Sequence, residues 1–210
     1  MEVTITRTPD ELAAAFERLC CAEALGCDTE TSGLNPRSGR LYSVQFSDGE
    51  FNVLVPLSEG IAMGPLSELL ADEGITKIFH NARFDLEFLS AAGHVVKNVF
   101  DTMIAEKVLT RGARQSASLA DTLYRYFAVD LDKSQRAKFT RKWDGIWTDD
   151  LVDYALSDVV HLPSLMREQS AWLERLALTP RYEELIRPLL AAAEPDSARY
   201  AGDDAPRGRS

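Results

Sequence analysis

Four acidic residues and one tyrosine, on three separate segments, have the types and spacing of a site for divalent cations. Asp28 and Glu30 lie in GCDTETSGLNP, Asp85 lies in HNARFDLEFL, and Tyr154 and Asp158 lie in DYALSDVV. Hard divalent cations prefer several carboxylate oxygens that converge from different parts of a chain. A tyrosine one helical turn before the last carboxylate can orient a water for attack on a phosphodiester. The set therefore predicts metal-dependent phosphodiester cleavage.

Each piece of this set also has a plain structural interpretation. The chain holds 33 acidic residues among 210, so acid-x-acid pairs arise by chance. Asp85 has the position of an acid at a helix start, which the helix dipole favours. What favours a site is the combination and its context. Asp28 and Glu30 end an otherwise apolar strand, and residues two apart on a strand share a face.

The composition predicts one intracellular domain. Hydrophobic residues make up 45% of the chain, enough for one sizeable core. We expect a cytoplasmic protein without a membrane partner, because no stretch could span a bilayer and the N-terminus lacks a signal pattern. Cys20, Cys21 and Cys27 lack the spacing of a zinc site and suit a reducing compartment. The net charge of −10 argues against broad, sequence-independent binding of duplex nucleic acid, but it is compatible with an enzyme that holds a few nucleotides through cations.

Hydrophobic patterns predict the order of strands and helices. EVTITR alternates as a strand, and TPDE at positions 8–11 is a capping box that opens a helix to about Cys21. Three strands with short connections follow in ALGCDTE, LYSVQFS and FNVLVP, which favours an antiparallel meander. Strands in ITKIFH and VVKNVF then alternate with a short helix at PLSELLAD and a helix from about Arg83 to Ala92. Asp101 has the position of a cap for a further helix.

These elements predict an α/β fold with a mixed five- or six-stranded sheet flanked by helices and a helical C-terminal half. One domain is expected over residues 1–193. Residues 194–210, EPDSARYAGDDAPRGRS, are small and polar and contain proline and glycine. This composition predicts a disordered tail.

The carboxylate segments together resemble the motifs of the DEDD superfamily of 3′→5′ exonucleases. The match is to its tyrosine-bearing (DEDDy) branch, which includes ribonuclease D and the proofreading domain of DNA polymerase I. D-x-E followed by T-x-G-L stands at 28–34, N-x-x-aromatic-D at 81–85, and Y-x-x-x-D at 154–158. The intervening FDTMIAEKVL and SLADTLYRYFAVDLDKSQ also resemble ribonuclease D. The resemblance covers about two thirds of the chain and implies a ribonuclease H-like fold.

This resemblance assigns roles to the matched acidic residues. It implies that two divalent cations, Mg2+ or Mn2+, are held by Asp28, Glu30, Asp85 and Asp158. Asp28 would be shared between the two cations, and Asp85 would act through water. Cleavage of the last phosphodiester would release a nucleoside 5′-monophosphate.

The resemblance also implies contacts with the reacting nucleotide. Tyr154 would orient the attacking water. Leu34 resembles an apolar wedge between the terminal bases, and Asn81 and Phe84 resemble residues that line the terminal nucleotide. These positions are expected to form the substrate side of the site.

A basic segment with aromatic residues precedes the segment that carries Tyr154. Residues 133–142 contain no acid and five basic residues, namely Lys133, Arg136, Lys138, Arg141 and Lys142. Phe139, Trp143 and Trp147 are interleaved or adjacent. Cations for phosphates and rings for bases are typical of a track for single-stranded nucleic acid. The track predicts substrate contacts at Arg136, Lys138, Arg141 and Trp143; a solvated basic loop is the equal alternative.

The expected activity is that of a free-standing exonuclease on single-stranded 3′ ends of DNA or short RNA. It would act either in proofreading with a separate DNA polymerase, or in RNA processing like ribonuclease D and compact nanoribonucleases. Ribonuclease D has helical nucleic-acid-binding domains after its catalytic domain, whereas about one helical hairpin follows Asp158 here. An inactive nucleic-acid-binding module beside a polymerase is the alternative of another class. Such modules typically lose carboxylates, and this chain keeps all four.

Overall fold

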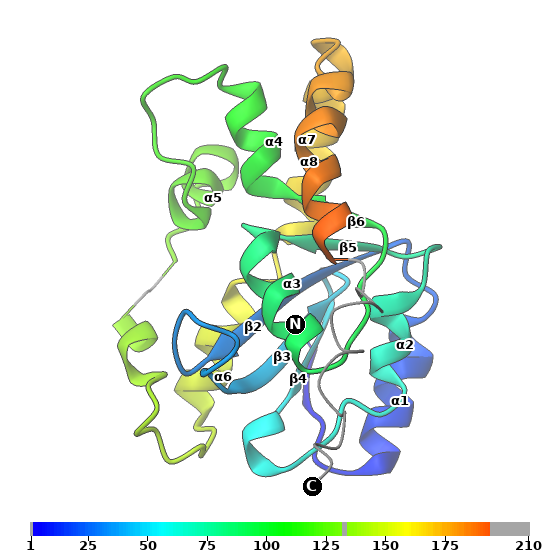
Figure 1. The fold of residues 1–210 in the computed structure, drawn as a ribbon, viewed down its shortest axis with the longest axis vertical. Coiled ribbons are helices and arrows are strands. Elements are labelled where there is room, and N and C mark those ends of the chain that lie inside the picture. Colours follow the sequence, from blue (N-terminus) through cyan, green and yellow to red (C-terminus); the bar gives the residue numbers. More distant parts are fainter. Residues whose placement is uncertain (1, 132–133, 194–210) are drawn as a thin grey trace, which may run out of the picture.

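The computed structural model describes residues 2–131 and 134–193 (Figure 1). The strands are β1 (Glu2–Ile5), β2 (Ala24–Thr31), β3 (Leu41–Ser47), β4 (Phe51–Val55), β5 (Thr76–Phe79) and β6 (Val99–Asp101). The helices are α1 (Pro9–Leu19), α2 (Leu66–Ala71), α3 (Ala82–Ala91), α4 (Thr102–Leu109), α5 (Leu119–Phe127), α6 (Asp149–Ser157), α7 (Leu162–Arg175) and α8 (Thr179–Ala193). Two short 3-10 helices are η1 (Leu57–Glu59) and η2 (Ser134–Lys138).

The six strands form one mixed sheet in the order β1-β4-β3-β2-β5-β6. β2, β3 and β4 pair antiparallel, which confirms the meander. The pairs β1/β4, β2/β5 and β5/β6 are parallel. The predicted α/β fold with a mixed sheet and a mainly helical C-terminal half is therefore confirmed.

The sequence patterns predicted the start of the first helix correctly and the start of the last strand too early. At α1, Thr8 Oγ1 accepts a hydrogen bond from Glu11 N at 3.2 Å, and Glu11 Oε2 accepts one from Thr8 N at 2.9 Å, which confirms the capping box. The helix ends at Leu19 rather than near Cys21. The strand predicted in VVKNVF begins only at Val99, because Asn98 has a left-handed φ of 52° and pairing with β5 starts at Val99.

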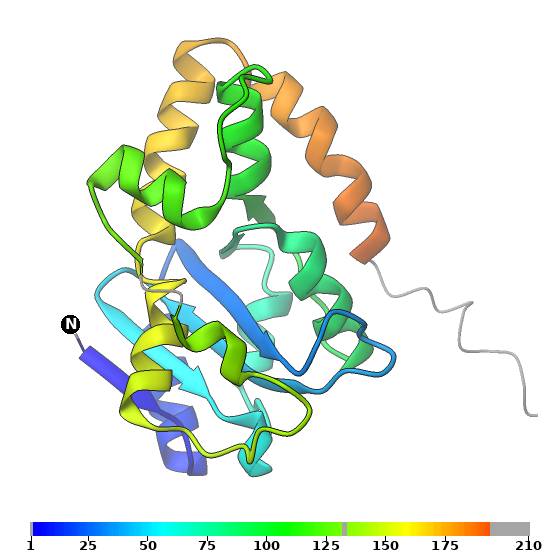
Figure 2. The same cartoon turned by 90° about the vertical axis from the view of Figure 1, so that its left-hand side faces the viewer.

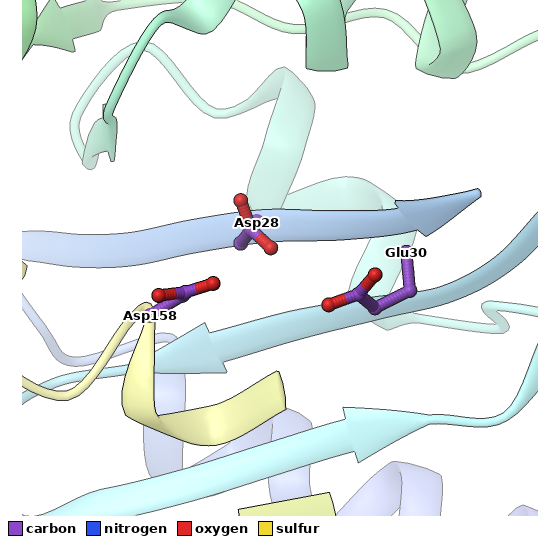
Figure 3. A group of neighbouring side chains, drawn as sticks. All are labelled: Asp28, Glu30 and Asp158. Atoms are coloured by element: carbon purple, nitrogen blue, oxygen red, sulfur yellow. The ribbon is translucent and has the colours of Figure 1, made fainter. Parts of the chain in front are cut away.

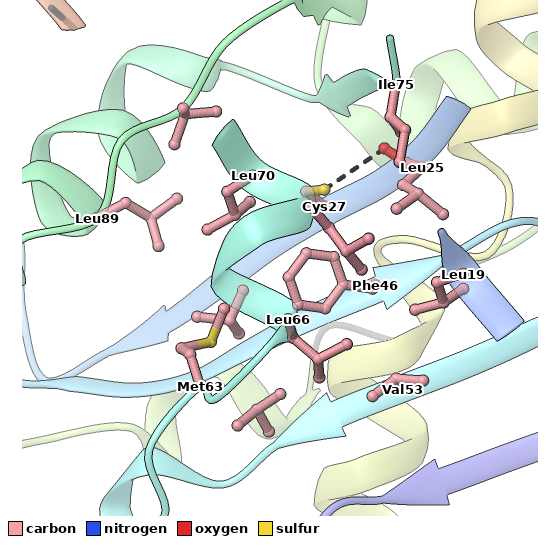
Figure 4. Close-up of a cluster of buried hydrophobic side chains, with 14 of the residues drawn as sticks. Leu19, Leu25, Cys27, Phe46, Val53, Met63, Leu66, Leu70, Ile75 and Leu89 are labelled. Atoms are coloured by element: carbon pink, nitrogen blue, oxygen red, sulfur yellow. Dashed lines mark hydrogen bonds between the residues drawn. The ribbon is translucent and has the colours of Figure 1, made fainter. Parts of the chain in front are cut away.

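Helices cover both faces of the sheet. α1, α2 and α3 pack on one face, where Leu25 and Cys27 of β2 join the buried cluster in Figure 4. Burial raises the pKa of the Cys27 thiol, so that this thiol stays protonated. α6 and α7 pack on the opposite face, against Leu54 and Ile78. Since successive residues of a strand face opposite sides, Gly26, Asp28 and Glu30 face the α6 side.

β2 extends beyond its parallel neighbour. β5 pairs with β2 only from Ala24 to Gly26, so the Asp28 to Thr31 stretch has a strand on one side only. The start of α3 follows β5 directly and therefore lies beside this uncovered stretch. α4, α7 and α8 pack together at one end of the molecule (Figure 2).

Some expectations are not tested by this fold. The predicted tail at 194–210 lies outside the described residues, and a single domain over 1–193 stays a prediction. Among the described residues, no helix has the length and apolar character needed to cross a bilayer.

Candidate active site

Three of the predicted acidic residues converge on one point. Asp28, Glu30 and Asp158 each offer a carboxylate oxygen, and these oxygens lie within 4.8 Å of one another (Figure 3). Glu30 is buried, and the other two are half-buried. Asp28 and Glu30 come from one face of β2, as the strand pattern predicted, and Asp158 follows the last turn of α6.

Gly26 permits the approach of Asp158 to β2. A Cβ at this position would lie 2.4 Å from the carbonyl oxygen of Val159 and 3.1 Å from Cβ of Leu162. These distances are shorter than ordinary contacts, so only glycine lets the α6–α7 junction come this close. The junction carries Asp158, and Gly26 precedes Asp28 by two residues on the same face. The short contact therefore sets the spacing between Asp28 and Asp158.

Asp85 reaches the same region from the opposite side. It lies in the first turn of α3, is buried, and accepts a hydrogen bond from Thr29 Oγ1 at 2.6 Å. Asp85 is outside the group of three that share one point, but it borders the same pocket. This position fits the sequence expectation that Asp85 supports the site from a separate segment.

Asp101 aligns the helix that carries Asp85. Its carboxylate caps α4, accepting from Met103 N at 2.8 Å and Ile104 N at 3.1 Å, which confirms the predicted cap. The same carboxylate accepts from Asn81 N at 3.3 Å and Ala82 N at 2.9 Å. One buried side chain therefore satisfies backbone donors at the starts of both α3 and α4.

Burial and crowding disfavour the charged forms of Asp28 and Asp85. Burial raises the pKa of Asp28 well above its usual range, and the charges of Asp85, Asp158 and Glu30 raise it further. Burial likewise raises the pKa of Asp85 to about 7. Bound divalent cations relieve such repulsion and match the hard oxygen donors present. This donor set therefore fits the predicted cations.

Tyr154 borders the same pocket from α6. Its ring is buried and lies 5.9 Å from the ring of Phe139, between centroids. Phe139 in turn packs on Trp147 at 5.5 Å and on Trp143 at 5.1 Å. The aromatic cluster thus holds the Tyr154 ring, one helical turn from Asp158.

The pocket enclosed by these residues has a volume of about 400 Å3. The three positions expected to contact the terminal nucleotide all border it, namely Leu34, Asn81 and Phe84. Leu34 projects at the rim with 81% of its surface exposed. Asn81 starts α3 with a left-handed φ of 72°, and Phe84 is half-buried at 5.1 Å from Phe88.

The basic segment differs in part from its prediction. Phe139 and Trp147 are buried and Trp143 is half-buried. The prediction that these rings together stack on bases is therefore wrong for the two buried rings. The rings become part of the core because they pack on each other and on Tyr42. Lys138 and Arg141 are exposed, as expected. Lys133 lies outside the described residues, as does the side chain of Arg136.

Sequence reasoning missed several residues of this region. Thr29 carried a detectable signal, because it lies between the two acidic residues of β2. Gly26 carried none, since its contact is with Val159 and Leu162, far along the chain. His80 also borders the pocket, with Nδ1 at 2.8 Å from Thr102 Oγ1 and Nε2 at 2.9 Å from the Ala117 carbonyl. Nothing in the sequence around His80 indicates these partners, which come from distant segments.

Known proteins match most of this chain. Ribonuclease D of Zymomonas mobilis subsp. mobilis is 36% identical over 188 residues, which is 81% of this chain and 47% of the relative. DNA polymerase I of Aquifex aeolicus is 32% identical over 177 residues, 84% of this chain and 28% of that protein. The chain thus spans about half the length of the ribonuclease D that it matches, and less of the polymerase.

A solved structure matches over nearly the whole chain. NrnC of Brucella melitensis superimposes with a TM-score of 0.77 and 31% identity, covering 97% of this chain and 98% of NrnC. The sequence model of the 3′-5′ exonuclease family matches residues 3–168, which include all five predicted catalytic positions. On these grounds the chain belongs to the 3′-5′ exonuclease family.

Proposed function

We propose that this chain is a two-metal 3′→5′ exonuclease that releases nucleoside 5′-monophosphates from free 3′ ends of single-stranded nucleic acid. The observation that carries this proposal is the convergence of Asp28, Glu30 and Asp158 within 4.8 Å. Tyr154 and Asp85 border the same pocket, so all five expected positions meet at one site.

Each of the five expected residues has its own role in this proposed reaction. Asp28, Glu30 and Asp158 would hold one cation, Asp28 would also hold the second, and Asp85 would support the second through water. Divalent cations in such a site neutralise charge on the phosphodiester and lower the pKa of water. The Tyr154 hydroxyl would form a hydrogen bond with the attacking water and keep this water in line with the scissile bond.

The pocket rim would position the terminal nucleotide. Leu34 projects from the rim and can separate the last base from the one before it. Phe84 offers an apolar surface to the last nucleotide, and Asn81 offers an amide for hydrogen bonding. These contacts place the terminal phosphodiester beside the carboxylates.

Related structures support both the cation and a nucleic-acid ligand. Brucella melitensis NrnC has been solved with bound Mg2+ and with bound pGG. We extend the choice of Mg2+ or Mn2+, and activity on very short strands, to this chain by that likeness. The proposal covers two biological settings, ribonuclease D-like processing of RNA and proofreading beside a separate DNA polymerase. A cytoplasmic location stays a prediction from composition.

A time course on matched 5′-labelled DNA and RNA oligonucleotides tests this proposal. The panel includes dinucleotides and is run with Mg2+, with Mn2+ and with excess chelator. We expect shortening from the 3′ end that stops on chelation, and the DNA to RNA rate ratio identifies the preferred sugar. Loss of the 5′ label before the 3′ end shortens would contradict the polarity.

The same assay addresses the alternative of an inactive binding module. Such a module would retain oligonucleotide binding and cleave nothing with either cation. Cleavage by the wild-type chain that is absent in Asp158→Asn, purified in parallel, would exclude that alternative and a contaminating nuclease together.

A further inference from the structure

The loop between β2 and β3, residues 32–40, has a conformation fixed by its own hydrogen bonds. Ser32 N donates to the Arg40 carbonyl at 2.9 Å, and Arg40 N donates back to Ser32 Oγ at 2.8 Å, which closes the base of the loop. Within it, the Asn35 carbonyl accepts from Ser38 N at 3.1 Å and from Gly39 N at 2.7 Å. Paired backbone groups of this kind give the loop a defined shape.

The loop is anchored on two sides. A Cβ on Gly39 would lie 2.9 Å from two ring carbons of Phe88, so the loop backbone rests directly on α3. On the other side, Arg141 Nη2 donates to the Ser38 carbonyl at 3.0 Å. Tyr42 Oη donates to the Thr140 carbonyl at 2.7 Å, which fixes the strand after the loop to the same segment. The loop and residues 138–142 are thus joined.

This joined surface is continuous with the active-site pocket. Leu34 of the loop and Phe139 of the neighbouring segment both border the pocket. A strand whose 3′ end occupies the pocket must leave it over the rim, and these two segments form part of that rim. Figure 2 shows them close together beside the end of β2.

The surface is basic in an acidic protein. Its exposed cations are Arg37, Arg40, Lys138, Arg141 and Lys142, and we name this set the basic rim. Within residues 2–131 and 134–193, none of the five forms an ion pair, although the chain has a net charge of −10. Unpaired cations gathered beside the pocket create a local field of the sign that attracts phosphate.

We propose that the basic rim binds the phosphodiester backbone of the nucleotides that precede the 3′-terminal one. This inference rests on the proposed exonuclease function and adds Arg37 and Arg40, from a loop far from residues 133–142 in sequence. Phe139 and Trp147 are buried and Trp143 is half-buried, so the rim offers mainly charge. Binding should therefore depend on salt and strand length and little on base identity.

The test compares two charge-matched double variants. Arg37→Ala/Arg40→Ala removes two rim cations, and Arg167→Ala/Arg187→Ala removes two exposed cations from α7 and α8, which do not border the pocket. The Michaelis constant is measured on dinucleotides and on strands of about ten nucleotides across a salt series. Arg141 is left intact because its hydrogen bond supports the loop.

The rim variant should raise the Michaelis constant on long strands more than on dinucleotides. Its logarithmic salt slope should flatten by about 1.4, since each lost phosphate contact removes about 0.7 for a single strand. The α7–α8 variant should match the wild type. Arg37→Lys/Arg40→Lys should restore most of the salt slope, because it restores the charges.

Other outcomes overturn the proposal. Equal losses on dinucleotides and long strands would show that the loop shapes the pocket, and no loss on long strands would show that the cations are merely solvated. If the wild-type chain cleaves nothing, the exonuclease proposal fails. Fluorescence anisotropy with a 5′-labelled strand in chelator then measures strand binding, which tests the basic rim separately. Weaker binding by the rim variant than by the α7–α8 variant supports it, and equal binding overturns it.

Discussion

Thr29 Oγ1 donates a hydrogen bond to Asp85 Oδ1 at 2.6 Å, and this bond joins the central strand to the first turn of α3. Thr29 lies between the two acidic residues of β2 but faces the other side of the sheet. Its hydroxyl therefore holds the one predicted ligand that comes from outside the group of Asp28, Glu30 and Asp158.

Thr29→Val should lower the affinity of the site for the metal while preserving the fold. The substitution keeps the β-branched shape and removes the donor, which leaves a buried carboxylate oxygen without its partner. We expect a higher half-saturating concentration of Mg2+ or Mn2+, measured by activity and by thermal shift. Thr29→Ser, which keeps the hydroxyl, should resemble the wild type; if both variants lose metal equally, packing rather than the hydrogen bond is responsible.

Asp28→Ala should abolish cleavage without unfolding the chain. The pKa of Asp28 is raised by burial and by three neighbouring carboxylates, so removing its charge relieves repulsion in the metal-free protein. The melting temperature in chelator should stay equal or rise, and the increase produced by Mg2+ should disappear. A lost cooperative melting transition would instead assign Asp28 a structural role.

Tyr154→Phe should slow the reaction and leave metal and substrate binding largely intact. The ring still packs on Phe139, and only the hydroxyl that orients water is removed. Positioning of this kind contributes about 10- to 1,000-fold in rate. Single-turnover cleavage with saturating substrate measures the effect, and wild-type turnover would place the hydroxyl outside the reaction.

Stability of the metal-free protein should fall as pH rises between about 4 and about 7. Asp85 has a folded-state pKa of about 7 against an ordinary value of 3.8, and that of Asp28 is also raised. In this window the folded state binds more protons than the unfolded state, so raising the pH favours unfolding. Melting curves in chelator across this range measure the trend. Asp85→Asn should flatten it, and an unchanged slope in that variant would contradict the assignment.

Gly26→Ala should move Asp158 away from Asp28. The new Cβ would collide with the Val159 carbonyl, and overpacking of this kind costs about 1–3 kcal/mol. We expect weaker metal binding and lower activity than in Val53→Ala, which destabilises the core on the opposite face of the sheet. If the two variants melt alike and also bind metal alike, the Gly26 contact does not set the site.

Several features could be predicted from the sequence alone, because they depend on residues that are close together in the chain. The capping box at Thr8 needs only neighbouring residues, and the alternation in β2 places Asp28 and Glu30 on one face wherever the strand lies. Asp101 was also readable as a cap for α4, because that cap involves residues two and three positions on. The five expected catalytic positions could be proposed because each lies in a short motif that resembles the exonuclease family; their catalytic roles stay a prediction.

Tertiary structure decided the features that depend on distant partners. Phe139 and Trp147 looked available for stacking, but burial against each other and the Tyr154 helix is favoured once the chain folds, since it removes large apolar rings from water. Asp101 caps a second helix, and Arg37 and Arg40 join a basic segment from far along the chain. The distance between Asp28 and Asp158 depends on a backbone contact at Gly26 that no local pattern encodes.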